Sequence, residues 1–354
     1  MRPITQTVPK ALVPLRNKPY MQYMVDAMKS AGLDGIVCSM GYLPEPIQRY
    51  FADQDLGGFS LDYVVEDQPL GTAGGIKNVE EHLDAGPFVA TNGDVLTAMD
   101  LREVIEAHVD SGALATITLT SVDDPTAYGL VEVDHRMRVR RFLEKPGRDE
   151  EVRTSLINAG IYVLEREVLN MIPKGREVSI EREIFPQLQS MGKLRAFVSS
   201  AYWRDIGTPR SYLAASHDVL SGAVGRGDGF KHLSVAPSAR LSKDVSLLPP
   251  VSIAEACEIE AGAIIGGRTS LGKGCSVGEG AMVEGSILLD GARVGEGTIV
   301  RNSIVGPGAI IHRDCVVRGL SVLGAECVVE EGNILDSGAR ISSGGFLPRG
   351  VMSF

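Results

Sequence analysis

Hydrophobic and polar residues follow two different periods along the 354-residue chain, and the period changes near residue 232. Before this point, short apolar runs alternate with amphipathic stretches. The runs predict buried strands and the stretches predict helices. The predicted strands span 35–40, 61–65, 87–91 and 113–119, and the predicted helices span 45–51, a stretch after residue 73, and 101–109. Strands that alternate with helices predict an α/β fold whose mostly parallel sheet is covered on both faces.

From residue 232 onward, an aliphatic residue recurs every six positions with small residues in between. The repeat runs in three phases: Ile259, Ile265, Leu271, Val277 and Val283, then Leu288, Val294 and Val300, then Ile304, Ile310, Val316, Val322, Val328 and Ile334. This pattern is typical of hexapeptide repeats, in which each unit forms a short strand whose aliphatic residue points inward. Resemblance to hexapeptide-repeat proteins implies a left-handed parallel β-helix of about six coils. We therefore predict a first domain at 1–220, a linker at 221–231 and a β-helix domain at 232–354.

Composition narrows the classes of partner. The net charge is −10 and the pI is about 5.2, which argues against a nucleic-acid or anionic membrane partner. The five cysteines show no CxxC spacing, so we expect reduced thiols and a cytoplasmic protein. No signal peptide or apolar run of about 18 residues is evident.

Two aspartates are candidate metal ligands. Asn92-Gly93-Asp94 directly follows a predicted strand, at the sheet edge where ligands bind in α/β folds. A carboxylate there can bind Mg²⁺ that also contacts phosphate oxygens, although the same three residues can form a simple turn. Asp205 precedes Pro209 and by itself can also be read as the cap of a helix.

Further segments carry glycines or charges. The glycine-rich stretch 69–75 precedes a predicted helix, where glycine permits a close approach of backbone or ligand. It can also merely close a strand–helix connection. Lys10 and the pair Glu144-Lys145, taken alone, are typical of exposed surface charges. The basic stretch 135–141 alternates with apolar residues and predicts the solvated face of a hairpin.

These segments together resemble the sugar-1-phosphate nucleotidyltransferases. The matching motifs occur in family order: R-P-I-T at 2–5 and P-K at 9–10, P-L-G-T-A-G at 69–74, N-G-D at 92–94, Y-G-L-V at 128–131, F-L-E-K-P at 142–146, N-A-G-I-Y at 158–162 and W-R-D-I-G-T-P at 203–209. The segment S-I-E-R-E-I-F-P at 179–186 is similar to one found in the mannose-1-phosphate guanylyltransferases. The resemblance implies a Rossmann-like, mostly parallel nucleotidyltransferase sheet followed by the β-helix.

The resemblance also implies a reaction and a set of site residues. A nucleoside triphosphate and a sugar 1-phosphate would give a nucleotide sugar and pyrophosphate, with GTP and mannose 1-phosphate favoured. Mg²⁺ would be held by Asp94 and Asp205. The catalytic residues implied are Lys10, Asp94 and Lys145. The nucleotide-binding residues implied are Pro69, Gly71, Thr72, Gly74 and Asn92, and the residues that bind the sugar phosphate are Tyr128, Gly129, Glu144, Lys145, Asn158 and Gly160.

The amino terminus departs from the family pattern. The sequence begins just before R-P-I-T, so the family's first strand and its loop G-G-x-G-T-R are not in it. That loop's amides would cradle the triphosphate. The strand would be central, so we expect an open apolar slot with unpaired backbone in the sheet. Two explanations compete: a misassigned start codon, favoured because the later motifs are intact, or a shortened, catalytically weak relative.

Other functions stay open. The chain could be a non-catalytic, regulatory subunit that binds sugar nucleotides, or a thymidylyl- or uridylyltransferase for glucose 1-phosphate. Acyl transfer by the β-helix is a further alternative, with His312 as the one histidine well inside the repeat. Because a repeat of this kind packs against another domain or subunit, we expect a homo-oligomer.

Overall fold

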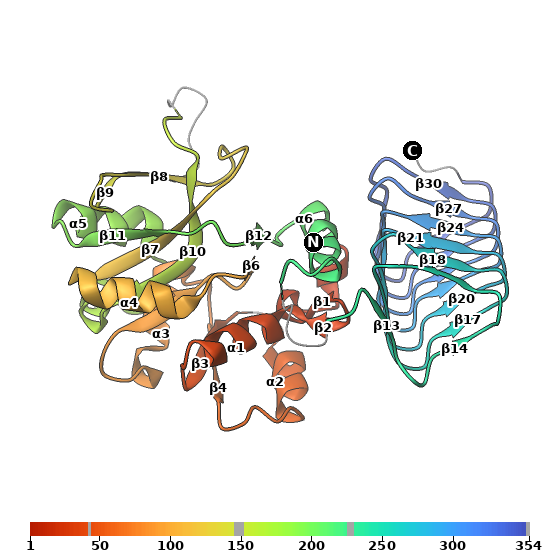
Figure 1. The fold of residues 1–354 in the computed structure, drawn as a ribbon, viewed down its shortest axis with the longest axis horizontal. Helices are drawn as coiled ribbons and strands as arrows, with labels where there is room; N and C mark the ends of the chain where they lie inside the picture. The colour runs from red at the N-terminus through yellow and green to blue at the C-terminus, as the bar shows by residue number, and fades with distance from the viewer. Residues whose placement is uncertain (42–43, 145–151, 225–229, 352–354) are drawn as a thin grey trace. The chain divides into compact units, whose positions relative to one another are not determined.

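The computed structural model describes residues 1–41, 44–144, 152–224 and 230–351 (Figure 1). Its contacts divide the chain into two compact units. One unit is Met24–Trp203, and the other joins Met1–Tyr23 to Arg204–Phe354. Both ends of the predicted domain 1–220 thus belong with the β-helix by contact, and the predicted domain boundaries stay a prediction.

Amphipathic sequences form the helices of the unit Met24–Trp203, together with α1 (Tyr20–Ser30), which begins in the other unit. In α4, Asp100 caps the first turn by accepting a hydrogen bond from the Arg102 amide at 2.9 Å, and Gly112 ends the helix with φ +60°. Both are standard helix-terminating devices. The helices are α2 (Pro44–Ala52), α3 (Gly71–Asn78), α4 (Leu101–Ser111) and α5 (Phe185–Ser190), with short helical turns at Glu80–His82, Arg166–Met171 and Ile180–Ile184.

A six-stranded sheet is the centre of this unit. Strands β5, β7 and β8 run antiparallel to β10, and β11 runs parallel to β7. Four of the six strands therefore share one direction, in line with the prediction, while β9 and β10 run the opposite way. The strands of this sheet are β5 Phe88–Thr91, β7 Ala115–Ser121, β8 Gly129–Val133, β9 Val139–Glu144, β10 Leu156–Leu164 and β11 Leu194–Val198. The short strands β6 (Val95–Thr97) and β12 (Trp203–Asp205) do not belong to it.

Strands β3 (Gly35–Met40) and β4 (Ser60–Val65) form a separate parallel pair. The prediction that 35–40 is a buried strand is right about the strand and wrong about burial, because each of its residues is half-buried. The physical reason is that, among the described residues, β3 pairs with β4 alone and β5 pairs with β10 alone. Among the described residues, the β3–β4 pair and the six-stranded sheet are thus separate, and the open apolar slot with unpaired backbone stays a prediction.

The second unit begins with an amino-terminal hairpin of β1 (Pro14–Leu15) and β2 (Lys18–Pro19), which pair antiparallel. The turn residues Arg16 and Asn17 both have positive φ. The Asn17 Nδ2 atom donates to Ser252 Oγ at 3.1 Å, and the Tyr212 hydroxyl of α6 (Pro209–Leu220) donates to the Pro14 carbonyl at 2.8 Å. These bonds attach the first residues of the chain to α6 and the β-helix.

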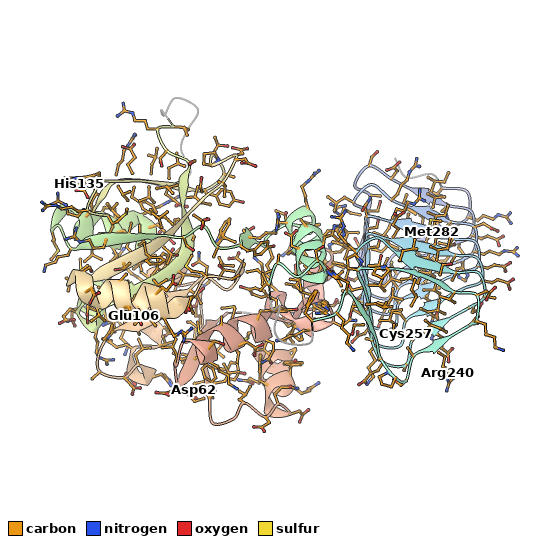
Figure 2. The ribbon with its side chains drawn as sticks, viewed as in Figure 1. Asp62, Glu106, His135, Arg240, Cys257 and Met282 are labelled. Atoms are coloured by element: carbon orange, nitrogen blue, oxygen red, sulfur yellow. The ribbon has the colours of Figure 1, made fainter. Side chains whose placement is uncertain are left out.

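The rest of this unit is a parallel β-helix with two seven-stranded sheets and one six-stranded sheet (Figures 1 and 2). This agrees with the prediction of about six coils, while the left-handed sense stays a prediction. The first sheet has β13 Leu233–Val235, β16 Val251–Ile253, β19 Thr269–Leu271, β22 Ile287–Leu288, β25 Ile304–Val305, β28 Val322–Leu323 and β31 Arg340–Ile341. The second has β14 Arg240–Leu241, β17 Glu258–Ile259, β20 Ser276–Val277, β23 Arg293–Val294, β26 Ile310–Ile311, β29 Val328–Val329 and β32 Phe346–Leu347. The third has β15 Ser246–Leu248, β18 Ile264–Gly266, β21 Met282–Glu284, β24 Ile299–Arg301, β27 Val316–Val317 and β30 Ile334–Leu335.

The inward column of the β-helix corrects one part of the predicted repeat. In its last third, the buried core contains Val305, Ile311, Val317, Leu323, Val329 and Leu335, each one residue later than predicted. The strands here carry two adjacent aliphatic residues, and successive side chains of a strand point to opposite faces. Periodicity alone could not choose between them. Ile334, predicted to point inward, is 39% exposed.

The described residues contain no helix that combines the length and apolar character needed to cross a lipid bilayer. All five cysteines are free thiols, as predicted.

Candidate functional site

The N-G-D and N-A-G segments lie against each other at the end of β5. The Asn92 amide donates a hydrogen bond to the Gly160 carbonyl at 2.8 Å. Gly160 has φ +74°, and a Cβ atom there would lie 2.7 Å from Asn92 Nδ2. Glycine is therefore required both by the backbone conformation and by the close approach of Asn92. Asp94, two residues after Asn92 in the chain, is half-buried.

Within β10, Asn158 holds this irregular backbone in place. Its Oδ1 atom accepts from the Gly160 amide at 3.0 Å, and its Nδ2 atom donates to the Tyr162 hydroxyl at 2.8 Å. The strand register shifts between Asn158 and Tyr162, which is typical of bulges next to functional sites. Trp203 Nε1 donates to the Ala159 carbonyl at 2.8 Å and packs edge-on against Tyr128 at 5.5 Å. The predicted sugar-site residues Tyr128, Asn158 and Gly160 are thus joined through one indole ring.

Strands β8 and β9 bring Gly129 and Glu144 together as a register pair. A Cβ atom at Gly129 would lie 2.6 Å from Glu144 Oε2 and 3.2 Å from Phe142 Cζ. The glycine leaves the space that the carboxylate needs beside the strand. Both residues belong to the predicted sugar site, while Lys145 lies outside the described residues.

The glycine-rich segment 69–75 is held by a loop that the sequence did not associate with it. The Gly71 φ is +69°, and a Cβ atom there would lie 2.7 Å from the Val178 carbonyl oxygen. A Cβ at Gly74 would lie 2.8 Å from the Arg176 carbonyl oxygen. The Val178 amide donates to the Leu70 carbonyl at 2.8 Å. These two glycines therefore allow close packing of protein backbone, whereas Pro69 and Thr72 are exposed.

Glu181 is a polar residue of this region to which sequence reasoning assigned no role. Its Oε2 atom accepts hydrogen bonds from Thr72 Oγ1 and Ser179 Oγ, each at 2.8 Å. Its Oε1 atom accepts from the Tyr162 hydroxyl at 3.3 Å. Burial, and next the charge of Glu181, raise the pKa of Tyr162 well above its usual value. The S-I-E segment that carries Glu181 was a signal for this residue, because the motif stood out for its likeness to one subgroup.

Lys10 and Asp205 belong to the other unit. Lys10 begins a short 3-10 turn, Lys10–Leu12, and is half-buried. Asp205 Oδ1 accepts from the Gly207 amide at 2.9 Å. It does not cap α6, because Thr208 does so in a capping box with Ser211. The alternative interpretation of Asp205 as a helix cap is therefore wrong.

The donors available for a cation are carboxylate oxygens, which suit Mg²⁺. The Gly207 amide orients the Asp205 carboxylate, and Asp94 lies in the short turn between β5 and β6. Among the described residues, no group of three or more histidine, cysteine, aspartate or glutamate side chains could hold a metal. A carboxylate of either kind can bind a cation that takes its remaining ligands from phosphate and water.

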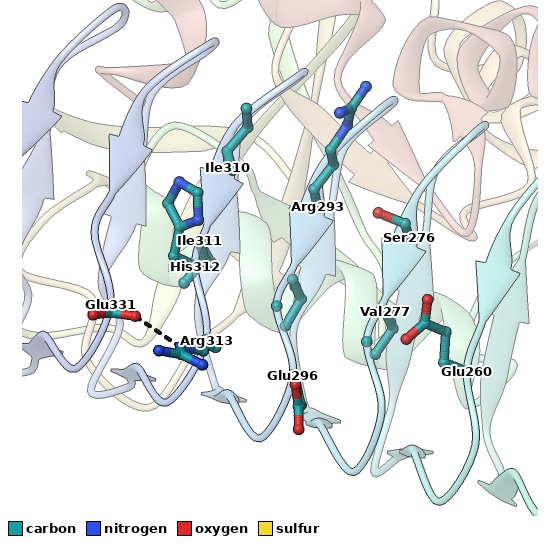
Figure 3. A pocket seen from close by; sticks show the side chains of 13 residues that line it. Glu260, Ser276, Val277, Arg293, Glu296, Ile310, Ile311, His312, Arg313 and Glu331 are labelled. Atoms are coloured by element: carbon teal, nitrogen blue, oxygen red, sulfur yellow. Dashed lines mark hydrogen bonds and ion pairs between the residues drawn. The ribbon is translucent and has the colours of Figure 1, made fainter.

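A separate depression of about 400 Å³ lies on the second sheet of the β-helix (Figure 3). It includes His312, whose Nε2 atom is 3.9 Å from Glu330 Oε1, and the ion pair between Arg313 and Glu331 at 2.7 Å. A Cβ atom on Gly278 or Gly295 in its wall would lie 2.7 or 2.6 Å from backbone of the next coil. Coil stacking thus explains these glycines without a ligand.

The fold and the polar strand-end site define a nucleotide-binding type of α/β unit joined to a parallel β-helix. Residues 1–222 match the family model described as nucleotidyl transferase, and residues 234–342 match that of the GMPPB C-terminal domain. The chain belongs to the nucleotidyl transferase family.

Relatives within the family carry more than one substrate name. The mannose-1-phosphate guanylyltransferase of Mycobacterium tuberculosis is 36% identical over 295 residues, which cover 83% of this chain and 77% of the relative. The UTP–glucose-1-phosphate uridylyltransferase of Synechocystis is 31% identical over 314 residues, which cover 83% of this chain and 80% of the relative. Among solved structures, HddC from Yersinia pseudotuberculosis complexed with GMP-PN is 28% identical, with a TM-score of 0.52 over 62% of this chain and 93% of that chain.

Proposed function

We propose that this protein transfers GMP from GTP to mannose 1-phosphate, giving GDP-mannose and pyrophosphate. The 36% identity with a relative named for this reaction supports the proposal. The observation that carries it is the network from Thr72 through Glu181, Tyr162 and Asn158 to Gly160. It joins the predicted nucleotide loop to the predicted sugar strand within one unit.

In the proposed reaction, an anionic oxygen of the sugar phosphate attacks the α-phosphorus of the triphosphate. A new phosphorus–oxygen bond forms, the α–β anhydride bond breaks, and pyrophosphate leaves with the electron pair. The attacking oxygen carries no proton that must be removed, so positioning and charge neutralisation matter more than acid–base chemistry. Glu144 and Asn158 would orient the sugar, Lys145 its phosphate, and Lys10 the triphosphate.

The same proposal assigns Asp94 and Asp205 as Mg²⁺ ligands. When bound, Mg²⁺ would reduce the electrostatic repulsion between the two anionic reactants. The oxygen chemistry of the two side chains supports this assignment. Isothermal titration of Mg²⁺ in the presence of GTP tests it, since Asp94→Asn should weaken metal binding more than Asp123→Asn, a change at an exposed aspartate.

The test of the function is pyrophosphate release with two substrate pairs. We expect GTP with mannose 1-phosphate to be used in preference to UTP or dTTP with glucose 1-phosphate. The assay should compare this chain with one that carries a G-G-x-G-T-R strand and loop upstream. Equal, robust turnover by both chains would overturn the claim that the loop is needed. Preference for UTP would favour the uridylyltransferase alternative, in line with the Synechocystis relative.

Binding without turnover marks the remaining alternatives. GDP-mannose binding with no pyrophosphate release, even by the extended chain, would favour a regulatory subunit. Acetyl-CoA binding near His312 would favour acyl transfer. We also propose a cytoplasmic location, which the five free thiols support.

We further propose that the chain forms a homo-oligomer through the third sheet of the β-helix. One outward position of this sheet is aliphatic in five successive coils: Ile264, Met282, Ile299, Val316 and Ile334. Ile334 is 39% exposed and the others are half-buried. A second copy has the same spacing between coils, so its row can interdigitate with this one. Light scattering should show Ile299→Glu to be monomeric and Ser276→Glu, on another sheet, to be unchanged. A wild-type monomer at micromolar concentration would contradict the proposal.

A further inference from the structure

Glu181 lies where three separate parts of the proposed site meet. Thr72 comes from the predicted nucleotide loop, Tyr162 from the predicted sugar strand, and Ser179 from the turn that carries Glu181 itself. All three donate hydroxyl hydrogen bonds to the one carboxylate, at 2.8, 3.3 and 2.8 Å. Hydrogen bonds to an ionised acceptor are stronger than neutral ones, so the carboxylate is a firm attachment point.

The bond to Thr72 is supported from its other side. Thr72 Oγ1 also accepts a hydrogen bond from the Ile180 amide at 2.8 Å. The Thr72 hydroxyl therefore donates to Glu181 and accepts from the residue just before it, Ile180. The turn itself, Ile180–Ile184, is π-helical, a conformation that occurs mostly as single turns at functional sites.

The network continues from Glu181 into the strand that holds the sugar motif. The Tyr162 ring is 1% exposed and packs edge-on against Phe185 at 5.0 Å. Its hydroxyl accepts from Asn158, whose other amide atom fixes the Gly160 backbone. A movement of Glu181 is thereby transmitted to both the loop at Thr72 and the strand at Gly160.

We propose that Glu181 is a positioning residue that fixes the nucleotide loop relative to the sugar strand, so that binding of the nucleotide and of the sugar phosphate is coupled. The proposal rests on the proposed function for the identity of the two ligands. It goes beyond that function by assigning a residue with no direct role in the reaction.

Glu183 provides a matched control on the same turn. A carboxylate in the first turn of a helical segment is favourable for that segment, and both Glu181 and Glu183 stand there. Glu183 Oε1 accepts from the Ser179 amide at 3.2 Å, and its Oε2 atom pairs with Arg176 at 2.9 Å. It has no bond to the nucleotide loop or the sugar strand among the contacts of the described chain. Loss of its charge should affect the turn without loosening the loop.

The first experiment measures amide hydrogen exchange of the full-length unliganded protein. Glu181→Gln should speed exchange in the 69–75 loop by about tenfold, whereas Glu183→Gln should leave that loop unchanged. Equal acceleration in both variants, or none in Glu181→Gln, would overturn the proposal. This readout does not require turnover, so an inactive wild-type protein would refute the proposed function alone.

The second experiment is a double-mutant cycle on steady-state kinetics. Glu181→Gln and Thr72→Val should each raise the KM for GTP by about tenfold. The double variant should lose about as much as either single variant, because both changes break the same bond. Thr72→Ser keeps the hydroxyl and should restore the wild-type KM. Multiplicative losses in the double variant, or failure of serine to rescue, would overturn the proposal.

Discussion

Thr72 Oγ1 lies 2.8 Å from Glu181 Oε2, although the two residues are 109 positions apart in the sequence. The same glutamate accepts from Tyr162, so the predicted nucleotide loop and the predicted sugar strand share one attachment point. This explains why the S-I-E segment can matter for function without lining the site with a reactive group. Its glutamate joins the two segments that are predicted to bind the substrates.

Replacement of Tyr162 by phenylalanine removes the middle of this network and keeps the ring. The hydroxyl donates to Glu181 and accepts from Asn158, while the ring still packs on Phe185. We expect the free energy of unfolding to fall by about 1–3 kcal/mol, since buried polar groups lose their partner. The KM for mannose 1-phosphate should rise more than the KM for GTP.

Urea denaturation and steady-state kinetics measure the two effects of Tyr162→Phe. Tyr50→Phe is the control, because the Tyr50 hydroxyl makes no hydrogen bond within the described part of the chain. Tyr50 also lies outside the proposed site. Equal losses of stability in both variants would mean that the network around Tyr162 contributes nothing.

Gly160→Ala should disturb the site more than its size suggests. An alanine at this position must adopt φ +74°, and its Cβ atom would lie 2.7 Å from Asn92 Nδ2. We expect a loss of about 1–3 kcal/mol in the free energy of unfolding, from backbone strain together with the displaced Asn92 side chain. Turnover should also fall, because Asn92 is two residues before Asp94, the proposed metal ligand.

Gly192→Ala separates the two causes. Gly192 has a similar φ of +69°, but a Cβ there would meet no atom within 4 Å. This variant should lose only the part of the stability that comes from backbone strain, about 1 kcal/mol, and should keep wild-type turnover. If Gly160→Ala were no worse than Gly192→Ala, close packing against Asn92 would have no energetic importance.

The sequence predicted the elements well where a pattern is local. The six-residue repeat identified the β-helix, and the Asn-Gly-Asp motif follows the end of β5 as predicted. The Asn-Ala-Gly motif was also expected at a strand end, but it lies inside β10. The inward column failed only where both strand residues are aliphatic, as at Ile310-Ile311. In such strands successive side chains point to opposite faces. The backbone geometry, and not the residue type, therefore determines which of the two aliphatic side chains is buried.

Long-range relationships could not be predicted in the same way. Residues 35–40 are apolar enough for a central strand, yet they are half-buried because their burial depends on a neighbouring strand. The partners of Gly71 and Gly74 are carbonyl groups about 100 residues later. Single-sequence patterns state which residues can approach closely, and only the tertiary structure states what approaches them.

In the β-helix, Gly295→Ala should be more damaging than Gly280→Ala. A Cβ on Gly295 would lie 2.6 Å from backbone atoms of His312 and Arg313, which cannot move without separating two coils. Gly280 has φ +63° and open space around it. We expect losses of about 3 kcal/mol or more and about 1 kcal/mol, respectively. Thermal unfolding followed by circular dichroism would measure both, and a reversed order would contradict the importance of coil stacking.

Stability should fall in mild acid because His108 is buried in its neutral form. The side chain is fully buried on α4, with Nδ1 2.9 Å from Thr116 Oγ1 and Nε2 3.4 Å from Glu165. Burial lowers its pKa from the usual value of 6.5, and the charge of Glu165 offsets this only in part. The unfolded chain therefore binds a proton near pH 6.5 that the folded chain does not yet bind. As the pH falls below about 6.5, the free energy of unfolding decreases until the folded-state pKa is reached.

Denaturant unfolding between about pH 7.5 and pH 5 tests this dependence. His108→Gln should flatten the decrease, since glutamine can contact Thr116 and Glu165 without titrating. His217 contributes in the same direction, because burial also lowers its pKa while its Nε2–H donates to the Gly285 carbonyl at 2.9 Å. Part of the slope should therefore persist in His108→Gln and decrease further when His217 is also replaced. His82 is exposed, so His82→Gln should give a curve parallel to that of the wild type. A His108→Gln curve with the wild-type slope would mean that protonation of His108 has no energetic cost in the folded state.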